Sequence, residues 1–382
     1  MNITTDSLQE AWHRLDAPGS YEWWYFDAED ESEGISVVFI WFAGFAFSPY
    51  YLSHYEEWKA HRRDDQPYPL DYGGFSFQLY QDGRETINFI KEGGREFFTS
   101  EDGGIGVRFE GNRFVYDPQR DEYRLSIDFS FPARDRSVQA SFSFRPLHRF
   151  DYHLDTDVHA GVDFRHQWVL SVPKAEVHGL LDIKSLSSDK RQVLQFRGRG
   201  YHDHNLGTVP MYESIDRWYW GRTFSRRCDL IYYVVFLRGC SAEPQAVLML
   251  LDHETGRQST FDAVRVSESR FTRGLFAPVH GKTLRLEAEG VSVEVQHQKA
   301  LDSGPFYLRY TSLLSMMIGE EAQEEVRGIS EFLNPAPLKS RLMQFLTASR
   351  VWRAGKRSAM YVLYNFFKHR FERFNRINRK KF

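Results

Sequence analysis

The sequence predicts an all-β protein that consists of two tandem antiparallel β-barrels and a basic helical tail. Three observations support this fold class. Short stretches of alternating apolar and polar residues recur along most of the chain, with turn residues between them and no helical periods. Aromatic side chains, which favour strands, account for 16% of the 382 residues. The order of elements in the first half is then repeated in the second half.

The first barrel is expected to begin at Tyr21-Glu22-Trp23-Trp24-Tyr25-Phe26-Asp27, which is followed by a nearly continuous apolar run at residues 35–47 that indicates a buried strand. The alternating residues 75–80 end at Asp82-Gly83, a pair that favours a hairpin turn. Residues 48–72 form a long insertion, which serves either as a lid or pocket wall or as a solvated loop. Further strands are expected at residues 124–129, 138–144, 169–183 and 193–196.

The second barrel is expected to open with Arg217-Trp218-Tyr219-Trp220, which echoes Glu22-Trp23-Trp24-Tyr25 and likewise precedes a strand of aromatic and β-branched residues. This repeat predicts a first barrel over residues 1–195, a second over residues 196–337 and a tail over residues 338–382. The strands expected in the second barrel are residues 230–236, 246–251, 260–266, 283–288 and 291–296.

The tail differs in composition from the rest of the chain. Residues 338–382 contain 13 Lys and Arg but one acid, Glu372, so they carry +12, and the remainder carries −15 to give the net charge of −3. Apolar residues recur in the tail at steps of three or four, as on one face of a helix. The tail is therefore either an interfacial helix on an anionic membrane surface or a helix packed on a barrel. The apolar residues are Met360, Leu363, Phe367, Phe371, Phe374 and Ile377, and the basic ones around them are Arg370, Arg373, Arg376, Arg379, Lys380 and Lys381.

Several classes of protein are disfavoured by the composition. The two cysteines, Cys228 and Cys240, cannot form a disulfide framework, and no apolar run approaches the length of a membrane span. The first ten residues contain no apolar signal core, so a cytoplasmic location is expected, with the inner membrane surface as an alternative site for the tail. Neither a phosphate-binding Gly-rich loop nor a Gly-x-Ser-x-Gly motif is present. The acidic body argues against a nucleic-acid partner.

The densest group of titratable residues is Tyr201-His202-Asp203-His204-Asn205, which is flanked by Gly198, Gly200 and Gly207. Two imidazoles, a carboxylate and an amide can donate, accept and orient a proton. The same group could instead satisfy backbone polar groups where two domains meet. His202 and His204 would share one face of a strand, but two histidines without a third ligand make a weak metal site, so neither a metal nor a cofactor is expected.

These motifs resemble those of the carotenoid 1,2-hydratase (hydroxyneurosporene synthase) family. The resemblance covers residues 21–338 and leaves out most of the tail. It implies two lipocalin-like domains, and relatives of the family include polyene cyclases and Diels–Alderases. Two departures stand out, because Leu206 occupies a position where the family has Trp, and Tyr232 and Tyr233 are followed by valines rather than by an acid. The motifs are residues 22–27 and 200–205, Trp218-Tyr219-Trp220-Gly221-Arg222 and Gly328-Ile329-Ser330-Glu331-Phe332-Leu333.

The resemblance implies acid–base chemistry on an apolar polyene or isoprenoid. Hydration of an isolated alkene requires protonation to a tertiary cation and attack by water, and a carboxylic acid buried among aromatics can hold the proton. Asp203 is the candidate acid, with His204 as its partner and His202 as a second relay. Arg222 would hold Asp203 or another carboxylate in place. The expected substrate-contacting residues are Tyr201, Trp218, Tyr219, Trp220, Arg222, Trp24 and Tyr232, in a pocket between the two barrels.

Three functions remain open at this point. The first is a cofactor-independent enzyme that hydrates, cyclises or isomerises C=C bonds of a hydrophobic substrate. The second is a lipocalin-like carrier that binds an apolar small molecule without changing it. The third is a pericyclase, which needs shape rather than a transferable proton. All three predict an aromatic pocket.

Overall fold

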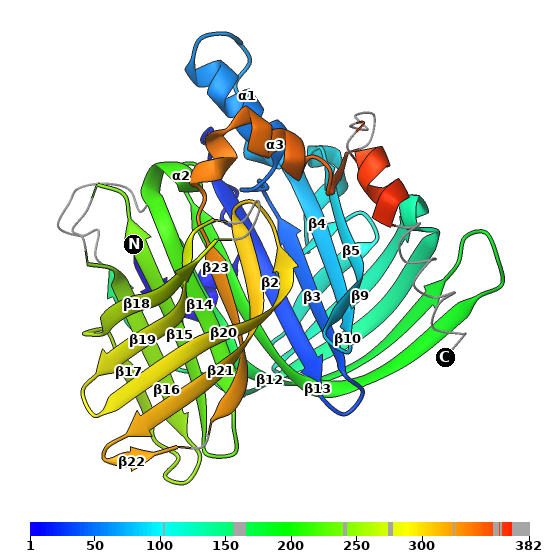
Figure 1. Cartoon of the computed structure of the whole chain (residues 1–382). Helices are drawn as coiled ribbons and strands as arrows, with labels where there is room; N and C mark the ends of the chain where they lie inside the picture. Colours follow the sequence, from blue (N-terminus) through cyan, green and yellow to red (C-terminus); the bar gives the residue numbers. More distant parts are fainter. Residues whose placement is uncertain are drawn as a thin grey trace. The chain divides into compact units, whose positions relative to one another are not determined.

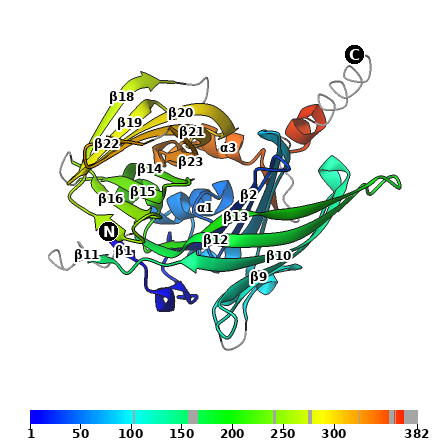
Figure 2. The ribbon, with the colours of Figure 1, turned by 90° about the horizontal axis from the view of Figure 1, so that it is seen from below.

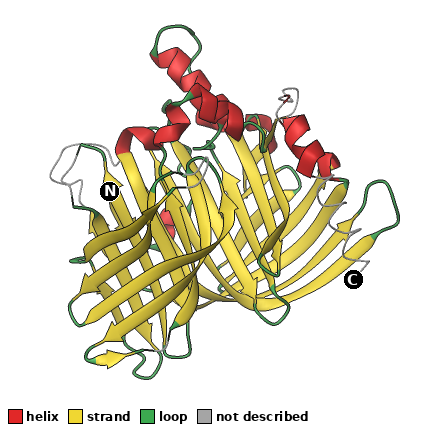
Figure 3. Cartoon of the chain, in the orientation of Figure 1, coloured by secondary structure: helices red, strands yellow, loops and turns green. Residues whose placement is uncertain are grey.

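The chain folds into two curled, mostly antiparallel β-sheets, as the sequence predicts (Figures 1 and 3). The computed structural model describes residues 1–101, 104–155, 166–239, 243–273, 278–323, 325–353, 359 and 361–368. Two compact units are present. Unit 1 comprises Met1–Pro210 and Gln344–Phe382, and unit 2 comprises Met211–Met343. Unit 1 therefore takes up both ends of the chain, and the division after Pro210 lies beyond the boundary at residue 195 that the motifs indicate.

The unit 1 sheet runs in the order β24-β5-β4-β3-β2-β13-β12-β10-β9-β8-β7-β6, and β1 and β11 join it beside β12. Figure 2 shows how its long strands bend. The strands are β1 (Asn2–Thr4), β2 (Tyr21–Asp30), β3 (Ile35–Phe42), β4 (Gly73–Gln81), β5 (Arg84–Gly93), β6 (Phe98–Ser100), β7 (Gly106–Phe109), β8 (Asn112–Asp117), β9 (Glu122–Phe131), β10 (Arg136–His148), β11 (His153–Asp155), β12 (Gln167–Lys184), β13 (Arg191–Gly207) and β24 (Val351–Arg353).

Aromatic side chains explain why this sheet curls. Phe89 of β5 stacks on Phe129 of β9 with ring centroids 4.2 Å apart, although the two strands are far apart in the sheet order. Trp41 of β3 likewise meets Phe114 of β8 at 5.1 Å. Burial of large apolar side chains from both ends of the sheet in one core outweighs the cost of bending the strands. The core thus lies on the inner, concave face.

Local sequence signals account for the connections. Asp82 and Gly83 both have positive φ, 52° and 63°, and join β4 to β5 in the predicted hairpin. The insertion at residues 48–72 contains helix α1 (Pro49–Lys59), for which Ser48 is the N-cap and accepts hydrogen bonds from the amides of Tyr50 and Tyr51. Short 3₁₀ turns occur at Ser7–Glu10, Pro69–Tyr72, Arg95–Phe97, Pro132–Arg134 and Ala336–Lys339.

The unit 2 sheet runs in the order β17-β16-β15-β14-β23-β21-β20-β19-β18, and β22 pairs with β21. It also curls, because Tyr219 of β14 donates a hydrogen bond to Glu268 of β18 at 2.5 Å although these strands are not neighbours. The elements are α2 (Met211–Ser214), β14 (Ile215–Phe224), β15 (Cys228–Leu237), β16 (Gln245–Asp252), β17 (Gln258–Phe261), β18 (Arg265–Thr272), β19 (His280–Ala288), β20 (Val291–Ser303), β21 (Tyr307–Ile318), β22 (Glu321–Ala322) and β23 (Val326–Leu333).

The first part of the predicted tail is integrated into unit 1. After helix α3 (Arg341–Thr347), strand β24 pairs in parallel with β5, and Arg353 forms an ion pair with the buried Glu92. Residues 361–368 are helical, and Tyr361 packs into the unit 1 core while Leu363 and Phe367 are exposed. The other predicted apolar positions, Met360, Phe371, Phe374 and Ile377, and the basic residues from Arg370 onward lie outside the described residues. None of the described helices is long and apolar enough to cross a membrane.

Candidate functional site

The alternation of side chains along β13 divides the predicted site between the two faces of the sheet. His202 and His204 point to the core face, where they pair with Phe26 and Trp24 of β2 in register. Tyr201, Asp203 and Asn205 point to the opposite face, and all five residues are buried. The partnership between Asp203 and His204 that the sequence suggested is therefore not formed.

His202 forms a buried pair with Glu10, which lies in the 3₁₀ turn at the N-terminal end of the chain. Its Nδ1 lies 2.8 Å from the carbonyl oxygen of Tyr25, and since a carbonyl can only accept, this nitrogen carries a hydrogen. Its Nε2 meets a carboxylate oxygen of Glu10 in a short contact, and both side chains are fully buried. Tyr123 donates to the other Glu10 oxygen at 2.6 Å. The contact between His202 and Glu10 consequently requires a second proton.

The surroundings of Glu10 favour its charged form. Burial by itself raises the pKa of Glu10, but the charge and hydrogen bond of His202, the Tyr123 hydroxyl and the charge of His204 outweigh it and hold the pKa below its ordinary value. Glu10 is therefore a carboxylate, which accepts the contact from His202 and the hydrogen bond from Tyr123. The pair is surrounded by the rings of Phe26, Tyr123 and Phe114.

His204 has a similar partner in Glu22 of β2. Its Nδ1 lies 3.1 Å from the carbonyl oxygen of Gln9, and its Nε2 lies 3.0 Å from Glu22 Oε1. His13 Nδ1 approaches the same oxygen at 3.1 Å. Burial raises the pKa of Glu22, yet the hydrogen bonds from His13 and His204 and their charges bring it below its ordinary value. Two carboxylate–histidine groups thus lie two residues apart along β13.

Asp203 is held by three donors on the other face of the sheet. Trp168 Nε1 and the Tyr201 hydroxyl donate to its Oδ2 at 2.9 and 2.8 Å, and Asn205 Nδ2 donates to its Oδ1 at 3.0 Å. A carboxylate has room for all three, since its two oxygens together offer about four lone-pair sites.

The predicted residues of unit 2 also separate by face. Tyr219 points into the unit 2 core. Because side chains alternate along a strand, Trp218, Trp220 and Arg222 lie on the other face of β14, where they are also buried. Trp218 lies 6.0 Å from the ring of Tyr233. Tyr232 is in the core, where its hydroxyl donates to Ser330 at 2.8 Å.

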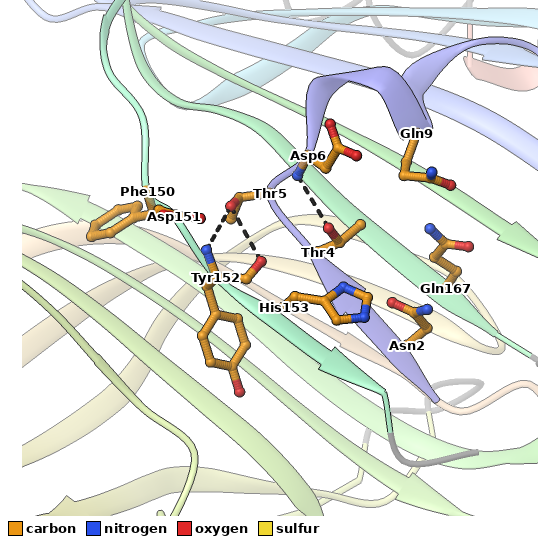
Figure 4. Close-up of a pocket in the computed structure, with 10 residues that line it drawn as sticks. All are labelled: Asn2, Thr4, Thr5, Asp6, Gln9, Phe150, Asp151, Tyr152, His153 and Gln167. Carbon is orange, nitrogen blue, oxygen red and sulfur yellow. Dashed lines mark hydrogen bonds between the residues drawn. The ribbon is translucent and has the colours of Figure 1, made fainter. Parts of the chain in front are cut away.

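A polar cavity of about 570 Å³ is lined by residues of the N-terminal segment, of residues 150–153 and of β12 (Figure 4). Asn2, Thr4, Asp6, Asp151 and His153 are among its lining residues. Figure 4 shows hydrogen bonds among its lining residues, from the amide of Asp6 to Thr4 Oγ1 and between Thr5 and Tyr152. Its lining is too polar for an apolar polyene, so this cavity is distinct from the site that the motifs predict.

Sequence reasoning missed the residues that complete these groups. Glu10, Glu22 and His13 supply the partners of the two histidines, and Tyr123 and Trp168 are further donors. Glu22 belongs to the first quoted motif and lies two residues before Trp24, so strand alternation places both side chains on the same face of β2. This spacing was the signal in the sequence that could have identified Glu22. Glu10 and Tyr123 lie more than 75 residues from His202 along the chain, and no local pattern links them to it.

Known proteins with similar sequences have names that refer to carotenoids. The chain is 96% identical over 382 residues to hydroxyneurosporene dehydrogenase of Chlorobaculum tepidum, with 100% of both chains covered. It is 26% identical over 312 residues to acyclic carotenoid 1,2-hydratase of Rubrivivax gelatinosus, covering 79% of this chain and 67% of that protein.

Solved structures support the fold. CghA in complex with Sch210972 superimposes with a TM-score of 0.56 at 13% identity, covering 83% of this chain and 89% of that one. Kievitone hydratase from Nectria haematococca gives a TM-score of 0.50 at 8% identity, with 83% and 89% covered. At these identities the likeness concerns the lipocalin-like fold alone. The model of the family described as carotenoid hydratase CrtC matches residues 148–360, more than half of the chain. The chain therefore belongs to the carotenoid hydratase CrtC family.

Proposed function

We propose that this protein adds water to an isolated C=C bond of an apolar polyene and that the proton comes from the His202–Glu10 pair. The observation that carries the proposal is the hydrogen on His202 Nδ1, which leaves the Nε2 contact with Glu10 dependent on a further, transferable proton. The family and the hydratase names of its more distant relatives support the reaction class.

The proposed steps conserve atoms. His202 gives its Nε2 proton to the alkene carbon, which produces a tertiary cation. Water adds to the cation, and the proton that this water loses returns to the pair, so the net change is the addition of one water. The rings of Phe26, Tyr123 and Phe114 can stabilise the cation through their π faces.

The other predicted site residues have supporting roles in this proposal. Asp203, fixed by Tyr201 and Trp168, provides a permanent negative charge on the second face of β13. His204 stacks on Trp24, with ring centroids 4.7 Å apart and planes within 4°, and this stacking keeps that end of the site rigid. Of the residues predicted in unit 2, Trp218, Trp220 and Arg222 share one face of β14 and stay predicted substrate contacts, whereas Tyr219 and Tyr232 lie in the unit 2 core.

The name of the relative from Chlorobaculum tepidum suggests dehydrogenation as a second candidate. Hydride transfer to a dinucleotide usually relies on a strand–helix–strand unit whose Gly-rich turn cradles the pyrophosphate. Within the described residues, the two parallel strand pairs, β1–β12 and β5–β24, are separated by long stretches of antiparallel sheet and form no such unit. This architecture favours hydration.

The mass of the product distinguishes the candidates. The purified full-length chain is incubated with neurosporene or lycopene in detergent micelles, and the extracts are analysed by mass spectrometry. Hydration adds one water, dehydrogenation removes two hydrogens, cyclisation or isomerisation leaves the mass unchanged with a new retention time, and a carrier returns the substrate intact. We expect the gain of one water, and any other outcome overturns the proposed reaction.

Matched variants test the acid. Glu10→Gln removes the charge that holds the proton on His202, and we expect turnover to fall at least about a hundredfold, the usual scale of general acid–base catalysis. The turnover of the Asp203→Asn variant, whose change lies on the other face of the strand, should fall by less. A folded Asp203→Asn variant with the larger loss would return the acid to Asp203. Thermal unfolding of each variant separates lost chemistry from lost structure.

We also propose that the C-terminal helix brings the protein to an anionic membrane, where polyenes dissolve. Val362, Leu363, Phe366 and Phe367 are exposed by 53%, 49%, 52% and 64%, although Tyr361 in the same helix is buried. Residues 338–382 carry a charge of +12. Exposed apolar side chains within a basic segment match an anionic lipid surface.

A further inference from the structure

We propose that His13, Glu22 and His204 bind a divalent transition-metal ion of the Zn²⁺ type. Their ligand atoms lie within 4.8 Å of one another. They come from three separate segments, which are the residues after the first 3₁₀ turn, strand β2 and strand β13. The site does not depend on the proposed reaction, because its evidence is the geometry of these three side chains.

The crowding around one oxygen is the first argument. Glu22 Oε1 lies 3.0 Å from the backbone nitrogen of His13, 3.1 Å from His13 Nδ1 and 3.0 Å from His204 Nε2, and the backbone nitrogen of His13 also lies 3.2 Å from Oε2. A carboxylate oxygen has two lone pairs, and the backbone N–H is an obligatory donor. Two imidazole nitrogens then compete for what remains. A cation between the three side chains turns both nitrogens into ligands and removes this competition.

The orientation of His204 is the second argument. Its Nδ1 must carry a hydrogen to bind the carbonyl oxygen of Gln9, so an ion that displaces the hydrogen between Nε2 and Glu22 meets the lone pair of Nε2. Ligating histidines characteristically donate their other ring N–H to a carbonyl or carboxylate in this way. Stacking on Trp24 fixes the plane of the ring. The nitrogen is therefore aimed at Glu22 before any ion binds.

The donor set indicates the class of ion. Two imidazole nitrogens and one carboxylate oxygen suit Zn²⁺, Fe²⁺ or Co²⁺, whereas Mg²⁺ and Ca²⁺ prefer oxygen ligands. Metal–ligand bonds of about 2.0–2.2 Å place tetrahedral ligands about 3.3–3.6 Å apart, a few tenths of an ångström more than the distances from Glu22 Oε1 to the two imidazole nitrogens. The side chain of His13 is 26% exposed, so it can move by this amount and gives the ion access from solvent.

The neighbouring His202–Glu10 pair is a natural contrast. It repeats the carbonyl-fixed imidazole and the buried carboxylate. Its additional partner is the hydroxyl of Tyr123, which donates to Glu10 instead of offering a second imidazole nitrogen, and both members are fully buried. That pair suits a proton, whereas the group containing His13 suits a metal ion.

The test uses the full-length protein after treatment with a chelator. Co²⁺ is added and its visible d–d absorption recorded, and Zn²⁺ binding is measured by calorimetry and by the rise in melting temperature that a ligand of the folded state produces. We expect one equivalent to bind. His13→Ala, at a solvent-accessible position, should weaken binding at least about tenfold, and Glu22→Gln should do the same.

His178→Ala is the matched control, because His178 is also an exposed histidine and lies 3.7 Å from a glutamate, Glu176, but the described residues offer this pair no third ligand. Its affinity should equal that of the unaltered protein. Absence of saturable Zn²⁺ or Co²⁺ binding by the full chain overturns the proposal. So does a folded His13→Ala variant that binds as tightly as the control.

Discussion

His202 lies flat against Phe26, with ring centroids 3.6 Å apart and ring planes within 5° of each other. The edge of the imidazole is held between the carbonyl oxygen of Tyr25 and the carboxylate of Glu10. Because the face of the His202 ring and both of its nitrogens are in contact, the ring is held in one orientation. A histidine held in this way can keep a proton at one defined position, which ordinary surface histidines cannot do.

The hydroxyl of Tyr123 should contribute measurably to this arrangement. Tyr123→Phe removes the 2.6 Å hydrogen bond to Glu10 and leaves a buried carboxylate oxygen without its donor. We expect the free energy of unfolding to fall by about 1.5–3 kcal/mol, the range for hydrogen bonds to charged groups. Urea titration measures it. Tyr116→Phe, which loses a 2.9 Å bond to the exposed Asp121, should change stability by less than about 0.5 kcal/mol; equal losses would contradict the special role of Tyr123.

Unit 2 should lose stability in mild acid because of His297. This buried side chain faces Tyr219, His280 and Tyr310. Burial, with a further contribution from His280, lowers the pKa of His297 from 6.5 to about 4. Between these values the unfolded chain binds a proton that the folded chain does not, so stability is complete above pH 6.5 and declines as the pH falls toward 4. The contribution lost between pH 7 and pH 5 is about 2 kcal/mol.

His297→Gln isolates this effect, since glutamine can still donate to the carbonyl oxygen of Gly281 that His297 Nδ1 contacts at 3.1 Å. Urea midpoints are compared at pH 7 and pH 5 for both proteins. The variant should show the smaller decrease. An identical decrease in both would mean that other groups, such as the buried His166, dominate the acid response.

Membrane binding should depend on the exposed side chains of the C-terminal helix. Leu363→Ser combined with Phe367→Ser removes two apolar groups that are about half exposed or more. Because each buried side chain of this kind contributes about 1.5–3 kcal/mol, partitioning to vesicles of phosphatidylglycerol and phosphatidylcholine should fall at least about tenfold. Co-sedimentation measures it. Phe271→Ser, a change at a 62% exposed phenylalanine of unit 2, is the control and should bind normally. An equally large loss of vesicle binding in the control would refute the assignment of membrane binding to this helix.

The strand that carries the histidines should not tolerate a side chain at Gly200. A Cβ there would lie 2.6 Å from Phe144 Cε1, 2.6 Å from Val177 Cγ2 and 2.8 Å from the carbonyl oxygen of Asp27. We expect Gly200→Ala to cost about 1–3 kcal/mol through overpacking. Gly104→Ala, where the new Cβ would meet nothing within 4 Å, should be close to neutral. Differential scanning calorimetry of the two variants distinguishes these outcomes.

Periodicity predicted the strands well because a buried sheet face imposes it. Residues 75–80 and 124–129 alternate in sequence and lie in β4 and β9, with Phe75, Phe77 and Phe129 in the core. The turn at Asp82 could also be predicted, since its positive φ is a local requirement. Strand β24 could not, because three residues carry no periodic signal and its partner β5 lies some 260 residues away.

The site was predicted in part for the same reason. The histidines of β13 are recognisable from local sequence, and their common face follows from strand alternation. Alternation also places Asp203 and His204 on opposite faces of the strand, although they are neighbours in the sequence motif. Glu10 and His13 reach the histidines only through the path of the N-terminal segment, which is a property of tertiary structure.

The pairing of β24 with β5 has a consequence for the order in which the protein can form. Unit 1 is built from the two ends of the chain, and unit 2 is encoded between them. During synthesis the ribosome completes the whole of unit 2 before residues 351–353 emerge. Until then the edge of β5 is unpaired and the ion pair between Arg353 and Glu92 cannot exist. The first unit to begin is therefore the last to be finished. A ribosome stalled before residues 351–353 emerge would present a completed unit 2 and a unit 1 with an open sheet edge, the kind of surface that chaperones bind and that promotes aggregation.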